Sequence, residues 1–302
     1  MISAIVVNWN GCRYLDGCLR ALLAQRYPAF EVLLVDNGST DGSVDYVRAH
    51  FPRVGVIAAP TNLGFAAGNN LGFAQARGEL LALVNNDTTC DPDWLAALAR
   101  AVAPADVAAA SGKFFALDDP TRVTCTLPLL NRYTASARWT VEDAPVRDVH
   151  YASGAGMLVK RAVVEQVGLL DPDYGAYYEE TDWCARMIVA GYRVVYTPEA
   201  TMRHQQGGST SAATMRYYLE RNRIRFALKN FDLPYLALFA PLYLAGVLRR
   251  ARRGGGAGRG PARALVARAI WWNLRQLPRT LRARRRDRGH LPSHRSYNRS
   301  LG

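Results

Sequence analysis

The strongest constraint on the fold is a regular alternation, within the first 110 residues, between short apolar runs and stretches of helical length. The apolar runs, each ending in polar residues, are 3–8, 31–36, 54–58 and 80–85. The helical stretches between them are 14–24, 43–50 and 65–77. Continuous apolar runs that alternate with helices are typical of a parallel sheet covered on both faces. We therefore expect an α/β fold with a mostly parallel sheet flanked by helices.

Polar side chains gather where three of these four runs end. Asn8 closes the first run, Asp36 closes the second, and Asn85, Asn86 and Asp87 end the fourth. Ligands of open α/β sheets bind outside the carboxyl ends of the strands, so we expect these side chains to share one site. An acid at a strand end can accept from a nucleobase or a ribose, and Asp87 with a neighbouring amide can hold Mg²⁺ beside a phosphate. Plain turns with helix caps remain the alternative for both corners.

Three further segments carry residue types that bind ligands or move protons. Residues 61–70 are a glycine-spaced helix start, which suits either a nucleotide near its backbone N–H groups or close packing on the sheet. Glu179 and Glu180 open a predicted helix over 179–190, where one can act as a general base while the other caps or pairs. His204 precedes a Gly/Ser loop, which suits a phosphate or a metal as well as a structural role.

Taken together and in this order, these segments resemble glycosyltransferase family 2, the inverting transferases with a GT-A fold. The matching segments are residues 6–11, 36–43, 62–69, 85–87, 153–155, 179–183 and 204–209. Each is weak alone, but seven in register are specific. The resemblance covers roughly residues 1–230 and is nearest to the bacterial rhamnosyltransferase-like branch. It implies a GT-A (Rossmann-like) sheet.

The resemblance also implies a role for each matched residue. Glu180 would be the catalytic base, supported by Glu179, and Asp87 with His204 would hold Mg²⁺ or Mn²⁺. The implied donor-binding residues are Val7, Asn8, Asp36, Asn37, Gly68, Asn69, Asn85 and Asn86, and the acceptor-binding residues are Gly154, Ala155, Asp182 and Trp183. This sequence has Asn85 in place of the first Asp of the family's DxD motif, and Glu180 in place of the usual Asp. We therefore expect the metal to bind weakly until a donor brings its diphosphate.

The implied activity is inverting transfer of a sugar from a nucleotide-diphosphate donor, dTDP-rhamnose being one candidate, to a hydroxyl of a glycan or lipid-linked acceptor in cell-wall or surface polysaccharide synthesis. Two alternatives stay open. A nucleotidyltransferase would need a basic pyrophosphate-binding loop, and residues 8–14 offer only Arg13. An inactive nucleotide-sugar-binding or polycationic scaffold protein would not need the acids of 179–182 or His204. A homo-oligomer is compatible with the sequence, and no nucleic-acid partner is expected.

Charge is distributed very unevenly along the chain. Residues 246–302 contain 16 Arg and a single acid, Asp287, for a net charge of +15, which leaves −2 for residues 1–245 out of the +13 of the whole chain. Residues 232–248 are apolar and contain Pro241, but their core of roughly 16 residues spans only about 24 Å as a helix, less than the ~30 Å of a hydrocarbon core. Residues 262–286 predict a basic amphipathic helix that Pro278 would kink. Its apolar side comprises Val266, Ile270, Leu274, Leu277 and Leu281.

These patterns divide the chain into a catalytic domain, residues 1–230, and a membrane-associating tail, residues 231–302, that is expected to lie on anionic lipid. A helical pair packed on the domain and a nucleic-acid-binding tail are the alternatives. The five cysteines lack metal-binding spacing, and the N-terminus lacks a signal-peptide pattern. We therefore expect a cytoplasmic protein, peripheral on the inner face of the cell membrane.

Overall fold

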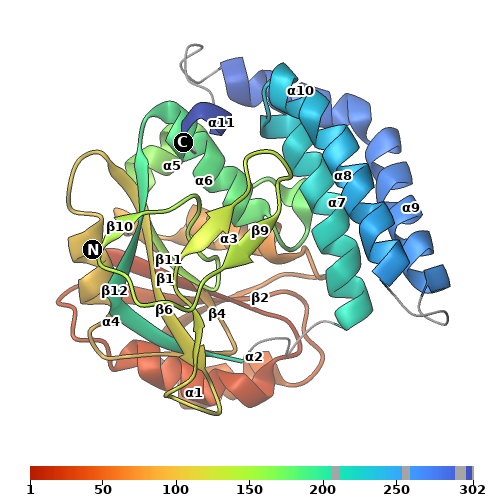
Figure 1. Cartoon of the computed structure of the whole chain (residues 1–302). Helices are drawn as coiled ribbons and strands as arrows, with labels where there is room; N and C mark the ends of the chain where they lie inside the picture. The colour runs from red at the N-terminus through yellow and green to blue at the C-terminus, as the bar shows by residue number, and fades with distance from the viewer. Residues whose placement is uncertain (206–210, 254–258, 290–296, 301–302) are drawn as a thin grey trace.

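A ten-stranded mixed sheet forms the centre of the molecule in the computed structural model, which describes residues 1–205, 211–253, 259–289 and 297–300 (Figure 1). All four apolar runs form strands, namely β1 (Ile2–Asn8), β2 (Phe30–Asp36), β3 (Val54–Ala58) and β4 (Leu80–Asn85). They are parallel and lie in the order β4-β1-β2-β3. The predicted parallel arrangement is confirmed in this half of the sheet.

The helices between these strands cover both faces of the sheet. Helices α1 (Cys12–Leu23) and α2 (Ser43–His50) pack on one face, and α3 (Phe65–Gln75) packs on the other. Successive side chains of a strand point to opposite faces, so Ala4 and Val6 share a core with α1, whereas Ile5 shares a core with α3. A Cβ on Gly72 of α3 would lie 2.5 Å from Ile5 Cγ2, so this glycine permits the close approach of helix to sheet.

Antiparallel pairing begins on the other side of β4. There β11 (Gly156–Lys160) separates β4 from β6 (Val107–Ala116), and β12 (Arg193–His204) and β10 (Arg147–Asp148) follow. The short strands β5 (Thr88–Cys90) and β7 (Val123–Cys125) extend β12 and β6. The sequence predicts two separate strands at 192–196 and 200–203, but both belong to β12. Its register against β6 shifts between Tyr196 and Thr201, around Pro198, which has no N–H to donate.

The remaining elements before the C-terminal helices are a small second sheet and several helices. Strands β8 (Pro128–Leu130) and β9 (Ala137–Trp139) form a small separate sheet, and α4 (Trp94–Ala101) packs on the same face as α1. Helix α5 (Arg161–Val167) and the 3₁₀ turn η1 (Pro172–Tyr174) lead to α6 (Glu179–Ala190) and then to α7 (Ala212–Asn230). Helix α6 has its predicted bounds and ends at Gly191, whose φ of 101° is in the left-handed region.

The C-terminal part is helical and comprises α8 (Leu233–Arg253), α9 (Arg259–Arg275), α10 (Leu277–Gly289) and α11 (Tyr297–Ser300). The single basic helix predicted over 262–286 is instead two helices that meet at Gln276. Pro278 explains the break. It lies in the first turn of α10, where its missing N–H has no partner to lose and its fixed φ suits the helix start.

The helices of this part pack against α7 and the sheet. Figure 1 shows α7, α8 and α9 forming a helical layer on one side of the sheet domain. Asn273 of α9 is buried and donates to Arg221 O of α7 at 2.9 Å, and Thr280 of α10 accepts from Arg225 at 2.8 Å. Packing of a helical pair on the domain, which the sequence left open, therefore describes α9 and α10. No helix within the described ranges is long and apolar enough to span a bilayer.

Candidate active site

The carboxyl ends of β1, β2 and β4 bring the predicted donor-binding side chains into one hydrogen-bonded cluster. Asn8 lies at its centre and is fully buried. Its Nδ2 donates to Asp36 Oδ1 at 3.0 Å, and its Oδ1 accepts from Asn86 Nδ2 at 2.7 Å. The register of the parallel strands places Asn8 opposite Asp36 and Val7 opposite Asn85, so the neighbouring strands align their polar ends.

The corner after β2 combines the two roles that the sequence left open. Ser39 N donates to Asp36 Oδ2 at 2.9 Å, and Ser39 Oγ accepts from Asn10 N at 2.9 Å, which ties this corner to the loop after β1. Asp41 accepts from Cys12 N at 2.9 Å, at the start of α1. Asp41 therefore satisfies a helix N-terminus, while Asp36 belongs to the polar cluster at the strand ends.

Asn37, which directly follows β2, and Gly68 hold the start of α3 against the sheet, whereas Asn69 bonds within α3. Asn37 Nδ2 donates to Gly64 O at 3.1 Å, and Asn69 Nδ2 donates to Phe65 O at 3.0 Å. A Cβ on Gly68 would come within 2.9 Å of Asn37 Nδ2, so close packing accounts for this glycine. The side-chain oxygens of Asn37 and Asn69 are buried without a hydrogen-bond partner in the described part of the chain.

Asp87 and His204, the predicted metal ligands, meet beside Asn85. The pairing of β5 with β12 places His204 opposite Thr88, and His204 Nε2 lies 3.3 Å from Asp87 Oδ1 and 3.4 Å from Asn85 Nδ2. Asp87 is 5 % exposed, and its Oδ1 has no hydrogen bond of good geometry among the described residues. A carboxylate oxygen, an imidazole and an amide suit a divalent cation as a partial ligand set.

This corner does not form a complete cation site from protein ligands. Nowhere in the described ranges do three His, Cys, Asp or Glu side chains converge as a metal-binding group. That arrangement agrees with the amide of Asn85 replacing a carboxylate. The Gly/Ser loop predicted to follow His204 includes residues 206–210, which lie outside the described residues.

Helix α6 begins with Glu179 and Glu180 directly after a strained backbone segment. Tyr177 and Tyr178 have φ angles of 67° and 74°, in the left-handed region that non-glycine residues rarely adopt. The hydroxyl of Tyr178 donates to Ala135 O at 2.7 Å, which ties the helix start to the segment between β8 and β9. Such strain persists only where surrounding contacts hold it, and here it sets the direction in which the two glutamates leave the helix start.

Asn222 of α7 provides those contacts, and the sequence analysis did not identify it. This fully buried side chain donates from Nδ2 to Ala176 O at 2.7 Å and to Tyr177 O at 2.6 Å, and it lies 3.0 Å from Tyr174 O. One amide group thus holds the main chain of the strained segment. An asparagine in a helix rich in Arg and Tyr carries no such signal in a single sequence.

We expect Asn222→Leu to lower kcat about 10- to 100-fold with little change in the KM for donor. The apolar side chain has a similar volume but leaves buried carbonyls without a donor, at a cost of about 1–3 kcal/mol each. Release of the strained segment would misplace Glu180, whereas the donor cluster lies on other elements. Steady-state kinetics and thermal unfolding provide the measurement. Arg216→Leu, an exposed position on the same helix, is the control. A uniform loss of kcat and donor affinity would contradict a positioning role.

The two glutamates have unusual acidities. Burial raises the pKa of Glu180 to about 7, and hydrogen bonds to the carboxylate from its own N–H and from Thr181 oppose this shift only partly. Burial, together with the negative charge of Glu180, raises the pKa of Glu179 well above its usual value. Two neighbouring carboxyl groups in a water-poor site do not both ionise readily, so Glu180 ionises around neutral pH while Glu179 keeps its proton. Glu180 is the more exposed of the two and can serve as a base.

Gly154 and Ala155 connect Glu180 to the strand ends. A Cβ on Gly154 would lie 3.5 Å from Glu180 Cβ, so the glycine leaves room directly beside the base. Ala155 O accepts from Asn85 N at 3.0 Å. The loop before β11 therefore contacts both the base and the metal corner.

Asp182 and Trp183, assigned by the resemblance to acceptor binding, have no surface to offer an acceptor. Both are fully buried. Asp182 binds Lys229 Nζ at 2.8 Å and Arg186 Nε at 3.1 Å, and Trp183 Nε1 donates to Gly168 O at 2.7 Å. Asp182, two positions after Glu180, points to the opposite side of the helix, and the Trp183 ring stacks on Phe73 of α3 with ring centres 5.5 Å apart. These two residues anchor α6 to the core of the protein.

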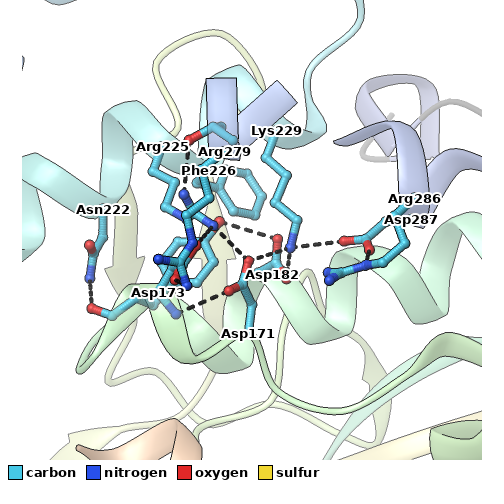
Figure 2. A network of polar contacts seen from close by, with 12 residues as sticks. Asp171, Asp173, Asp182, Asn222, Arg225, Phe226, Lys229, Arg279, Arg286 and Asp287 are labelled. Atoms are coloured by element: carbon cyan, nitrogen blue, oxygen red, sulfur yellow. Dashed lines mark hydrogen bonds and ion pairs between the residues drawn. The ribbon is translucent and has the colours of Figure 1, made fainter. Parts of the chain in front are cut away.

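A buried network of charges surrounds Asp182 and joins three parts of the molecule (Figure 2). Lys229 of α7 binds Asp182, Asp171 and Asp287 at 2.8, 2.9 and 2.9 Å, and Arg225 binds Asp171 at 3.0 Å. Lys229 and Arg225 hold the pKa of Asp171 well below its usual range despite its burial. Asp287, the only acid of residues 246–302, thus links α10 to the helix that carries Glu180. Removing one partner of a buried ion pair typically costs about 3–5 kcal/mol.

The fold matches that of solved GT-A glycosyltransferases. A mannosyltransferase from Pyrobaculum calidifontis in complex with GDP-Man and Mn²⁺ superposes with a TM-score of 0.59 at 19 % identity, over 99 % of this chain and 85 % of that one. GalNAc-T7 with UDP, GalNAc and Mn²⁺ superposes with a TM-score of 0.65 at 12 % identity, over 92 % and 57 %. At these identities the likeness establishes the fold, which is the GT-A class.

The chain belongs to glycosyl transferase family 2, whose family model matches residues 3–168. It is also similar to the N-acetylglucosaminyl-diphospho-decaprenol L-rhamnosyltransferase of Mycobacterium tuberculosis. The two sequences are 26 % identical over an alignment that covers 84 % of this chain and 96 % of that protein. The family and the rhamnosyltransferase-like resemblance expected from the sequence are both confirmed, and they support a role in glycosyl transfer.

Proposed function

We propose that this protein is an inverting glycosyltransferase that moves a sugar from a nucleotide-diphosphate donor to a hydroxyl of a glycan or lipid-linked acceptor. One observation carries the proposal. Glu180, a carboxyl group with a pKa of about 7, lies against Gly154 in a loop that also contacts the strand-end cluster. A base that is half ionised at neutral pH is well matched to taking a proton from a sugar hydroxyl.

Different residues of the site carry out proton transfer and donor binding. Glu180 accepts the proton of the acceptor hydroxyl, whose oxygen forms a bond to the anomeric carbon on the side opposite the leaving group. The bond from that carbon to the phosphate oxygen breaks, and the nucleoside diphosphate leaves with the electron pair. Glu179, kept neutral by burial, avoids a second negative charge beside the base. Asn8, which is fully buried, holds Asp36 and Asn86 in place through hydrogen bonds, and these two side chains would contact the nucleoside and ribose.

A divalent cation, Mg²⁺ or Mn²⁺, fits the corner formed by Asp87, His204 and Asn85. When bound there it neutralises negative charge on the leaving diphosphate. Protein ligands are few at this corner, so the proposal includes weak metal binding to the free protein and tighter binding once the donor diphosphate completes the ligand set.

Donor and acceptor classes follow from the relatives and from the tail. The similar mycobacterial protein is named as a rhamnosyltransferase of a diphospho-decaprenol acceptor, which favours a rhamnose-type donor and a lipid-linked acceptor in surface polysaccharide synthesis. A water-soluble catalytic site must approach such an acceptor at the membrane. A peripheral position on an anionic, cytoplasmic membrane face would meet that need, and the net charge of +15 over residues 246–302 supports it.

Thermal stabilisation by nucleotide sugars tests the donor assignment. We expect a donor such as dTDP-rhamnose or a UDP-sugar, added at 100-fold its Kd, to stabilise the protein by about 2.7 kcal/mol in the presence of Mg²⁺ or Mn²⁺. Metal alone should shift the unfolding temperature little. Tight metal binding to the free protein would contradict the partial ligand set. Release of pyrophosphate from a nucleoside triphosphate and a sugar phosphate would identify a nucleotidyltransferase instead.

A further inference from the structure

Helix α8 presents an apolar face to solvent along most of its length. Its exposed leucines are Leu233, Leu238, Leu242, Leu244 and Leu248, with exposed fractions of 75, 49, 44, 52 and 59 %. Exposed proline and alanine residues fill the gaps between them, and residues 233–248 contain no charged side chain. The opposite side of the helix is the one used for packing, where Phe239 and Tyr243 are buried. Folded proteins rarely leave a contiguous apolar surface of this extent uncovered unless it binds something.

The neighbouring helix extends this face. Helix α8 lies beside α9 (Figure 1), and Val266 and Ile270 of α9 pack into the same core as Tyr243 of α8. One helical turn further along the stripe, Leu274 is 65 % exposed, and Trp271 next to it is 58 % exposed. The amphipathic stripe predicted from the sequence is therefore divided in the structure. Its first part packs against the protein, and its end adds a leucine and a tryptophan to the exposed surface.

Arginines border this apolar surface. Arg249 follows its last leucine and is exposed, and Arg275 on α9 is exposed as well. The Arg275 guanidinium lies 5.3 Å from the centre of the Trp271 ring, so it reaches the edge of the apolar surface. Leucine and tryptophan surrounded by arginine match the chemistry of an anionic lipid surface, with acyl chains below and phosphate groups above.

We propose that the outer face of α8, with Trp271 and Leu274 of α9, docks in the plane of an anionic membrane surface. The docking face thus comprises the exposed leucines of α8 together with Trp271 and Leu274. Docking places the leucines at the boundary between headgroups and acyl chains, and it leaves the surrounding arginines at the level of the phosphates. The docking itself does not require glycosyl transfer. Only its consequence for the acceptor rests on the proposed function.

A chain of contacts joins the docking face to the catalytic base. Tyr235 of α8 stacks on Tyr133 in the segment between β8 and β9, with ring centres 5.7 Å apart. The same segment holds the hydroxyl of Tyr178 through Ala135 O at 2.7 Å, directly before Glu179 and Glu180. Trp139, at the end of β9 in the same small sheet, is 47 % exposed. The β8–β9 segment therefore connects the docking face to the start of the helix that carries Glu180, the base of the proposed function.

Vesicle flotation of the full chain tests the docking. The probes are phosphatidylcholine vesicles with and without about one third phosphatidylglycerol. We expect binding to the anionic vesicles, little binding to the neutral ones, and loss of most binding in high salt, because charges near the surface are screened. The triple variant Leu238→Ser, Leu242→Ser, Leu244→Ser should lower the bound fraction on anionic vesicles more than tenfold, since each leucine removed takes away apolar burial.

Two controls separate the outcomes. Leu169→Ser with Val146→Ser removes apolar side chains that are 49 and 55 % exposed elsewhere, and it should bind vesicles like the wild type. All three proteins should keep the same donor-dependent thermal stabilisation, so a docking failure can be told from a failure of the proposed function. Wild-type binding by the triple variant, or no binding by the wild type, would overturn the proposal. A wild-type dimer in light scattering that the triple variant dissociates would assign the face to a second copy of the chain.

Discussion

Glu180→Gln is expected to reduce sugar transfer by three or more orders of magnitude while the protein stays folded and binds donor. Glutamine keeps the size of the side chain and its place beside Gly154 but cannot accept the proton of the acceptor hydroxyl. General base catalysis typically contributes a factor of about 10²–10⁴. Single-turnover transfer and donor-dependent thermal stabilisation measure the two properties separately. Near wild-type transfer by this variant would remove Glu180 as the base.

The pH dependence gives an independent check on the same residue. The pKa of Glu180 is about 7, so the basic form is lost below this pH, and wild-type turnover should rise as pH increases through about 7 and then level off. Glu180→Asp should keep part of the activity, because it retains a carboxylate on a side chain one methylene shorter. Glu165→Gln, at an exposed position on α5, is the matched control and should leave both rate and pH profile unchanged.

The free energy of unfolding of the wild type should fall over the pH range in which its turnover rises. A carboxyl group whose folded-state pKa is raised holds its proton more tightly when folded, so the folded protein loses stability as pH rises from about 4.5 to about 7. Glu180→Gln removes that penalty. We therefore expect the variant to be more stable than the wild type at pH 8, by on the order of 1–3 kcal/mol, and similar to it at pH 4. Catalytic residues commonly lower the stability of the folded protein in this way.

The parts of the fold that the sequence predicted are those set by local pattern. Strands β3 and β4 and helices α2 and α6 have their expected bounds. The signals that set them, namely apolar runs, polar strand ends and a capping glycine, are local in the sequence. The donor cluster was predictable for a related reason. Adjacent parallel strands align their ends, so Asn8, Asp36 and Asn86 had to lie close together once the strand order followed that of a doubly wound sheet.

The parts that escaped prediction depend on contacts between distant segments. Asn222 is one polar residue in a polar helix, and only the packing of α7 beside the 174–177 main chain gives it a role. Asp182 has the sequence position of a site residue, but Lys229 and Arg186 approach it from the core side and bury it. The amphipathic period of residues 262–286 indicated one apolar stripe, and it could not indicate that Asn273 would bond to α7 while Leu274 stays exposed.

Asp87→Ala is expected to lower turnover by two or more orders of magnitude and to abolish the contribution of metal to donor binding. Asp87 supplies the only carboxylate of the corner it forms with His204 and Asn85. Without it, an imidazole and an amide remain as protein ligands, and a hard divalent cation binds such a set poorly. The charge that grows on the leaving diphosphate would then lack its main compensation, which is a term worth several kcal/mol in metal-assisted reactions.

Donor affinity is the most informative property of this variant. It distinguishes a carboxylate that binds the metal from one that only stabilises the fold. We expect the wild type to bind the nucleoside diphosphate more tightly when Mn²⁺ is present and Asp87→Ala to bind it equally weakly with and without Mn²⁺, as measured by calorimetry. Asp91→Ala, which removes an exposed acid four residues further along, should keep the full metal effect. If Asp87→Ala instead loses fold stability but retains the metal effect, Asp87 acts only by fixing His204 and β12. A retained effect in both variants would move the cation to other ligands, and the donor diphosphate would then bind away from the carboxyl end of β4.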